Sequence, residues 1–161
     1  MTRNPTGLLD DTVTRDYARK LRLFNAFAEP ELRQAIASLG IERGMRVLDA
    51  GCGTGAALGW LAGEVGPQGL AVGLELATAH IAAARTAMPV ATVLQADIHR
   101  PPLARGSFDL IWAVNTVNHL RDPSAVLDRL TELLRAGGRI ALGQSSLLPD
   151  KIGRASCRER V

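Results

Sequence analysis

The sequence VLDAGCGTG at residues 47–55 combines glycines and a carboxylate in a pattern that could bind a small ligand. Gly51, Gly53 and Gly55 stand at alternate positions, where the missing side chains let the backbone turn sharply and approach a ligand. A helix that begins at Gly55 would direct its free N–H groups toward this loop. With Ala56 in the third place, the segment also fits the loose GxGxxG/A pattern of dinucleotide-binding loops, which leaves a dinucleotide open.

Asp49 helps to separate these two kinds of ligand, because it precedes the first glycine by two residues. A carboxylate there would repel a pyrophosphate, at about 3 kcal/mol for one like-charge contact near 5 Å and an effective dielectric near 20. It would suit a ligand that carries positive charge and no phosphate. S-adenosylmethionine, with an ammonium and a sulfonium, is such a ligand. Asp49 could instead orient the loop by accepting backbone N–H bonds.

The elements that must position this loop follow from the hydrophobic periodicity, which predicts five short buried strands alternating with helices. The expected strands are residues 46–50, 70–74, 90–95, 108–114 and 139–143. The expected helices are residues 55–64, 77–88 and a segment from Asp122 to Gly137, preceded by two helices within residues 11–39 that separate at Glu29-Pro30. This alternation predicts a doubly wound, mostly parallel α/β sheet, whose ligands bind at the carboxyl ends of the strands.

Five segments together resemble the motifs of class I S-adenosylmethionine-dependent methyltransferases, in order and in spacing. They are VLDAGCGTG at 47–55, AVGLE at 71–75, LQAD at 94–97, SFDLI at 107–111 with NHLRDP at 118–123, and LRAGGRI at 134–140. The resemblance covers residues 43–143 and implies a Rossmann-like fold with S-adenosyl-L-methionine as cofactor. The family sheet usually has seven strands, so we expect the last two to be missing here.

The resemblance also implies which residues hold the cofactor. The methionine portion is expected on Asp49, Ala50, Gly51, Gly53 and Gly55. Glu75 would accept both ribose hydroxyls, because a carboxylate has two oxygens that match a vicinal diol. Leu76 would pack on the adenine, Asp97 would accept from its amino group, and the Ile98 N–H would face the ring. Ala113 and Asn115 would line the methyl-donor end. Asp97 could instead be a turn-forming aspartate, and Glu75 a solvated acid.

The catalytic chemistry is less clearly marked than the cofactor site. His119 follows the fourth expected strand and is the candidate catalytic base, although packing or helix capping is an alternative role. Direct transfer from a sulfonium needs mainly proximity and alignment. Tyr17 and Arg22 on the N-terminal helix are candidate contacts to the methionine carboxylate, and the apolar face of this helix favours a small, partly apolar acceptor. The three histidines lack metal-ligand spacing, so no metal is expected.

Composition excludes several other classes. The chain has 161 residues, of which 47% are hydrophobic and 22% charged, a composition that excludes a disordered chain. It contains no apolar run of about 18 residues, so we expect no transmembrane helix. Four of the 19 basic and one of the 16 acidic residues lie in the last eleven, so the remainder holds 15 of each. This balance gives no reason to expect nucleic acid or membrane insertion. Two cysteines make no disulfide framework, and we expect a cytoplasmic protein.

The last ten residues, IGRASCRERV at 152–161, resemble the translation of a sequencing adapter. A natural basic tail is the alternative. We therefore expect three parts: a helical cap at 1–42, an incomplete S-adenosylmethionine-binding domain at 43–150, and a non-native tail at 151–161. The expected function is methyl transfer to a small acceptor. A truncated fragment that binds the cofactor without turnover, and an NAD-dependent oxidoreductase, stay open as alternatives.

Overall fold

Five parallel strands form one sheet at the centre of the chain. The computed structural model describes residues 11–89 and 91–144. The strands are β1 (Arg46–Ala50), β2 (Leu70–Glu75), β3 (Thr92–Gln95), β4 (Phe108–Val114) and β5 (Leu134–Gly143). Their order across the sheet is β3-β2-β1-β4-β5, and every pair is parallel. Because β1 lies between β2 and β4, the direction of winding reverses at β1, where folds of this kind open a ligand crevice. The α/β sheet predicted from the sequence is thus confirmed.

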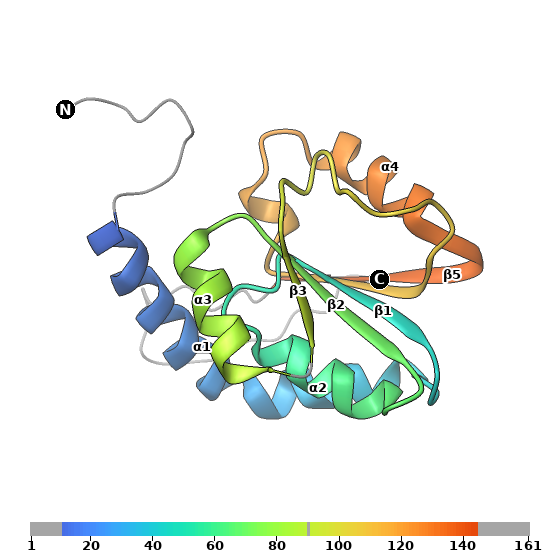
Figure 1. The fold of residues 1–161 in the computed structure, drawn as a ribbon, viewed down its shortest axis with the longest axis horizontal. Coiled ribbons are helices and arrows are strands. Elements are labelled where there is room, and N and C mark those ends of the chain that lie inside the picture. The colour runs from blue at the N-terminus through green and yellow to red at the C-terminus, as the bar shows by residue number, and fades with distance from the viewer. Residues whose placement is uncertain (1–10, 90, 145–161) are drawn as a thin grey trace, which may run out of the picture.

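Helices cover both faces of the sheet. They are α1 (Asp11–Ser38), α2 (Ala56–Val65), α3 (Thr78–Ala87) and α4 (Pro123–Leu133), with a short 3-10 helix η1 (Val117–His119) after β4. Figure 1 shows α1, α2 and α3 on one side of the sheet and α4 on the other. Strand pleating divides the core accordingly, because successive side chains point to opposite faces. On β4, Leu110 and Trp112 pack toward α2, while Ile111 and Ala113 pack toward α4.

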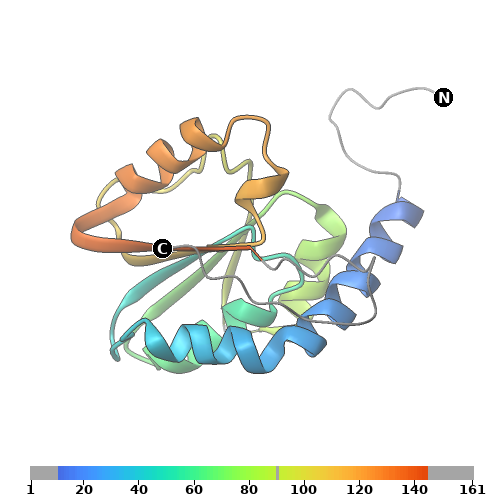
Figure 2. The same ribbon diagram turned by 180° about the vertical axis from the view of Figure 1, so that it is seen from behind.

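The N-terminal helix differs from the sequence-based prediction of two helices. α1 runs through Pro30 as one helix of 28 residues. Proline has no N–H to donate and crowds the preceding turn, so inside a helix it either kinks the helix or breaks it. Figure 2 shows the axis of α1 changing direction along its length. Beyond Pro30 the helix is anchored by Ile36, which is buried among the side chains of the α2 face.

The boundary between α4 and β5 also differs from the prediction, which ended the helix at Gly137. α4 ends at Leu133 and β5 begins at Leu134. The N–H groups of Gly106 and Ser107 bind the carbonyls of Glu132 and Leu133, at 3.0 and 2.8 Å, and so draw the helix end onto the start of β4. The extra residues are accommodated by a register shift between Phe108 and Leu110. The third strand was expected from Val90, which lies outside the described residues.

None of the helices within the described ranges is both long and apolar enough to span a membrane.

Candidate functional site

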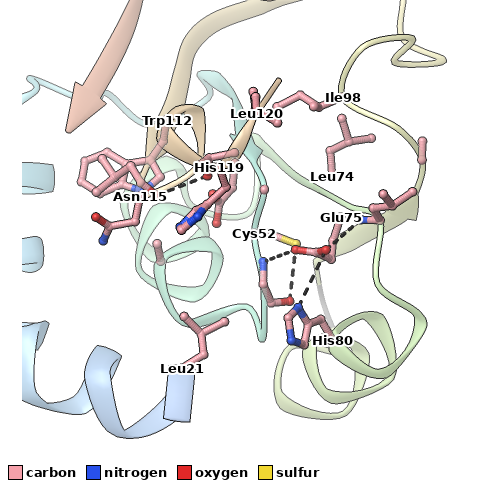
Figure 3. A pocket seen from close by; sticks show the side chains of 18 of the residues that line it. Leu21, Cys52, Leu74, Glu75, His80, Ile98, Trp112, Asn115, His119 and Leu120 are labelled. Carbon is pink, nitrogen blue, oxygen red and sulfur yellow. Dashed lines mark hydrogen bonds and ion pairs between the residues drawn. The ribbon is translucent and has the colours of Figure 1, made fainter. Parts of the chain in front are cut away.

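A cavity of about 310 Å³ opens at the carboxyl ends of the strands, where the winding reverses. It is bounded by the β1–α2 loop, the ends of β2 and β4, the loop after β3, and α1 (Figure 3). The residues predicted to hold a cofactor that line it are Asp49, Gly51, Gly53, Glu75, Leu76, Asp97, Ile98 and Asn115, together with the candidate base His119. Ala50, Gly55 and Ala113 do not line the cavity.

Strand parity explains the position of Ala113. Ala113 is 1% exposed and packs with Ala50 in the cluster beneath α4, on the far face of the sheet. Its neighbours Trp112 and Val114 point to the other face and line the cavity in its place. Trp112 is thus buried in the core and also forms part of the cavity wall.

Asp49 is the most unusual charged group of the site. Its side chain lies on β1 between Gly73 of β2 and Trp112 of β4, and the residue is 3% exposed. Within the part of the chain that the structure describes, its Oδ2 has no hydrogen-bond partner. Burial, followed by repulsion from Glu75, raises the pKa of Asp49 to about 7. A carboxylate held in this way is poised to pair with a cationic ligand, which would restore its ionised form.

Glu75 at the end of β2 binds two loops together. Its Oε2 accepts from the Gly53 N–H at 2.9 Å, and its Oε1 accepts from the N–H groups of Leu76 and Ala77 at 2.8 and 2.9 Å. His80 of α3 lies beside it, with Nδ1 3.8 Å from Oε1 (Figure 3). Burial alone would raise the pKa of Glu75, but the bonds from His80 and the backbone outweigh burial and lower it. Glu75 is therefore ionised near neutral pH and fixes the two residues that lead into α3.

The glycine loop packs closely against the chain's own residues, and the N–H groups of Gly51, Cys52, Gly53 and Gly55 already have acceptors. The N–H groups of Gly51 and Cys52 both donate to the Leu74 carbonyl, at 2.8 and 3.0 Å, and that of Gly55 donates to the Cys52 carbonyl at 2.9 Å. Gly51 adopts φ +84°, and a Cβ there would lie 2.5 Å from the γ atoms of Thr116. The absence of a side chain at Gly51 thus allows the β1–α2 loop to pack against Thr116.

The residues that follow β2 and β3 form another part of the wall. Leu76 is 50% exposed although it is a large apolar residue, so an apolar surface is available at the rim. Asp97 accepts from the backbone N–H of His99 at 2.9 Å and lies 2.7 Å from its Nδ1, through the same Oδ1. Asp97 Oδ1 thus has the turn-forming role given above as the alternative, and these bonds leave Oδ2 out. Hydrogen bonds from His99 lower the pKa of Asp97.

The loop after β4 forms the opposite wall. Asn115 has φ +58°, a left-handed conformation that non-glycine residues adopt rarely and that clusters at functional sites. Its N–H donates to the Gly143 carbonyl at 2.8 Å, which ties the loop to the end of β5. His119 follows in η1 and is exposed at the rim. A base at this position could exchange protons with solvent.

The N-terminal helix contributes three lining residues: Leu21, which belongs to the apolar face noted in the sequence, and Asn25 and Leu32, which the sequence did not single out. A Cβ at Gly53 would lie 2.7 Å from Leu21 Cδ2, so Leu21 rests on the glycine loop. Arg22 is exposed and does not line the cavity, and the side chain of Tyr17 lies outside the described residues.

Two further residues missed by sequence reasoning hold the site together. His80 supports Glu75, and the Gln95 amide donates to the Leu76 carbonyl and to Thr78 Oγ1, at 3.1 and 2.9 Å. Cys52 lines the cavity in a buried position, where burial raises the pKa of its thiol. Pattern reasoning did not find these roles, because the contacts of Gln95 join residues 17 and 19 positions apart and the approach of His80 to Glu75 depends on how α3 packs beside the end of β2.

The cavity fits S-adenosylmethionine in the chemistry of its walls. It offers a buried carboxylate without a second partner among the described residues, an ionised carboxylate at the end of β2, and an exposed leucine beside them. No group of three or more metal-ligating side chains occurs among the described residues.

Known proteins agree with this architecture. The family described as a methyltransferase domain matches residues 48–142. The chain is 32% identical over 127 residues to 27-O-demethylrifamycin SV methyltransferase of Amycolatopsis mediterranei, covering 76% of this chain and 47% of that protein. It is 34% identical over 121 residues to nocamycin O-methyltransferase of Saccharothrix syringae, covering 72% and 43%.

A solved structure, the SAM dependent methyltransferase from Aquifex aeolicus, superposes with a TM-score of 0.68 at 22% identity, over 78% of this chain and 71% of that one. This similarity establishes the fold. The chain spans less than half the length of the two curated relatives above. Because the family match extends over more than half of its residues, this chain belongs to the class I S-adenosylmethionine-dependent methyltransferase family.

Proposed function

We propose that the cavity binds S-adenosylmethionine and that the chain is the cofactor-binding part of an enzyme that methylates a hydroxyl of a small, partly apolar acceptor. The observation that carries the proposal is Asp49, a buried carboxylate that faces the cavity with one oxygen unbonded among the described residues. A ligand with an ammonium and a sulfonium offsets the cost of burying that charge, whereas a pyrophosphate would add to it.

Each wall has a role in this proposal. Asp49 would hold the positively charged methionine portion, with Gly51 and Gly53 allowing its close approach. Glu75 would accept the ribose hydroxyls, which requires one oxygen to share or release the N–H of Gly53. Leu76 would cover one face of the adenine, and the Oδ2 of Asp97 would accept from its amino group. The methyl-donor end would then lie toward Asn115 and His119.

The reaction needs little from the protein beyond alignment. When bound, S-adenosylmethionine supplies a methyl group that is already activated as a sulfonium. His119 would take the proton of the acceptor hydroxyl at an imidazole nitrogen as the oxygen attacks, and its exposure would return that proton to solvent. Trp112, Val114 and Leu21 would hold the acceptor's apolar part and exclude water. The oxygen acceptor is supported by the two relatives named above, one of which is called an O-methyltransferase and the other a methyltransferase of a 27-O-demethyl compound.

Cofactor binding is tested by thermal unfolding of the chain with S-adenosylhomocysteine, which cannot react. At 100 times the dissociation constant, binding should raise the free energy of unfolding by about 2.7 kcal/mol. Asp49→Asn should lose this gain, while Asp128→Asn, which removes an exposed carboxylate on α4, should keep it. A parent chain whose unfolding ignores the ligand would contradict the proposal.

Turnover is tested separately, with radiolabelled methyl donor and a panel of neutral phenols and enols. Methylation that His119→Ala reduces, with unchanged S-adenosylhomocysteine binding, would support the catalytic assignment. Binding without turnover for any acceptor would instead favour the alternative that this chain holds the cofactor only.

A further inference from the structure

A second cavity, of about 210 Å³, lies away from the first, between α4 and the loop that joins β3 to β4. Figures 1 and 2 both show this loop running beside α4 on the face of the sheet opposite α1. Three arginines line the cavity, Arg100 and Arg105 from the loop and Arg129 from α4. Its apolar wall consists of Pro101, Leu103 and Leu133.

The charges of this cavity do not balance. Glu132 is its one acidic lining residue, and its Oε2 accepts from both Arg105 and Arg129, at 3.2 and 2.9 Å. Arg105 and Arg129 therefore share a single carboxylate, and Arg100, whose charge also acts on Asp97, adds a third positive charge to the lining. The lining itself carries a surplus of two positive charges. Each guanidinium has five N–H donors in a planar fork, so the one or two donors directed at Glu132 leave several for a further acceptor.

The two walls are fixed to each other by backbone bonds. Gly106 and Ser107 of the loop donate to the last carbonyls of α4, at 3.0 and 2.8 Å. Those carbonyls would otherwise present the negative end of the helix dipole to the cavity. The N–H groups of Gly106 and Ser107 satisfy these two carbonyls, so the arginine donors are not needed there. The geometry points to a preformed binding site for an oxyanion.

We propose that this second cavity binds the dianion of a small phosphomonoester. A phosphate ester carries close to two negative charges at pH 7 and offers three acceptor oxygens, which match the surplus charge and the converging guanidinium forks. The volume leaves room for the phosphoryl group and a short apolar portion against Leu103 and Leu133. A carboxylate would neutralise only half of the surplus, so phosphate is preferred to a monocarboxylic acid.

The test uses phenyl phosphate as the probe, titrated into the whole 161-residue chain and followed by amide chemical shifts in ¹H–¹⁵N spectra. We expect the shifts to concentrate on Leu103–Ser107 and the end of α4. Phenyl phosphate should bind more tightly than inorganic phosphate, because of the apolar wall, and more tightly than benzoate, because of the charge. Shifts confined to the first cavity, around Gly53 and Asn115, would overturn the proposal.

Matched variants separate the site from general attraction to a basic surface. Arg105→Gln with Arg129→Gln should weaken binding by about tenfold or more, since charge-assisted bonds are lost. Arg43→Gln with Arg121→Gln removes the same two charges from exposed positions outside the cavity and should change the affinity less than twofold. Equal losses in the two proteins would mean that phosphate is attracted only nonspecifically.

A further variant is expected to increase the affinity for phenyl phosphate. Glu132→Gln removes the competing carboxylate and should tighten phenyl phosphate binding several-fold. Weaker binding would contradict the argument from surplus charge. S-adenosylhomocysteine binding in the first cavity should stay unchanged in all these variants, so failure of this proposal and failure of the proposed function are distinguishable.

Discussion

Asp49 connects protonation to ligand binding at the level of a single residue. Its pKa is raised to about 7, so a cationic ligand binds to a form that loses population as the pH falls below 7. For one group, the apparent dissociation constant should rise about tenfold one pH unit below the pKa and stay nearly constant above pH 8. Calorimetric titration with S-adenosylhomocysteine between pH 5.5 and 8.5 checks this dependence. A flat profile would show that Asp49 does not pair with the ligand's charge.

The same residue should affect stability with the opposite sign. A carboxyl group whose pKa is higher in the folded than in the unfolded chain stabilises the fold fully below the unfolded value, near 3.9, and loses that contribution as the pH rises through 7. Unliganded protein should therefore lose stability between about pH 4 and 7 through Asp49, and Asp49→Asn should reduce this slope. Denaturant unfolding at a series of pH values provides the measurement. An identical slope in the variant would contradict the assignment.

Glu75 should behave differently, because both of its oxygens already accept backbone N–H groups. In Glu75→Gln the amide has one acceptor oxygen, so either Gly53 N–H or the N–H groups of Leu76 and Ala77 lose their partner. An unsatisfied buried donor costs about 1–3 kcal/mol, which thermal unfolding would detect. Glu64→Gln, at an exposed position on α2, is the control and should change little. Unchanged stability of Glu75→Gln would show that these bonds carry no net energy.

At the level of elements, the contact between two loops shapes the mouth of the site. The φ of +84° at Gly51 disfavours any side chain, and a Cβ there would meet Thr116 at 2.5 Å. Gly51→Ala should therefore lower the free energy of unfolding by at least about 1–2 kcal/mol from backbone strain, with an added cost for the clash. Thr116→Ala in the same chain should recover the part that comes from the clash. Chemical denaturation of the single and double variants measures this coupling, and strictly additive effects would rule it out.

Some elements of the fold could be predicted from the sequence and others could not. The glycine loop, the sheet and the acid at the end of β2 were predictable, because short buried runs and glycine spacing are local signals. The helix through Pro30 was not, since its continuity depends on Ile36 packing onto the sheet. The early end of α4 depends on hydrogen bonds to residues 106 and 107, more than twenty positions away. Local patterns thus located the strands but not the contacts that set their boundaries.

At the scale of the whole molecule, the described residues leave the two outer strands of the sheet, β3 and β5, unpaired on one side, and β5 is the longer of them. β5 pairs with β4 along one side, and Leu142 near its end is 55% exposed. A long strand with free N–H and carbonyl groups and an apolar side chain is a template for pairing with another strand. We therefore expect the 161-residue chain to associate at high concentration through β5.

Leu142→Lys tests that expectation, because a charge on an edge strand opposes pairing with a second strand. In sedimentation velocity, the variant should remain monomeric at concentrations where the parent associates, with S-adenosylhomocysteine binding unchanged. Leu23→Lys supplies the control, since it places the same charge on an equally exposed leucine of α1. If both variants reduce association alike, general surface hydrophobicity drives it, and a parent that stays monomeric throughout would show that the edge is protected. Since β5 is tied through Gly143 to the Asn115 loop, an occupied edge would also hold one wall of the first cavity in place.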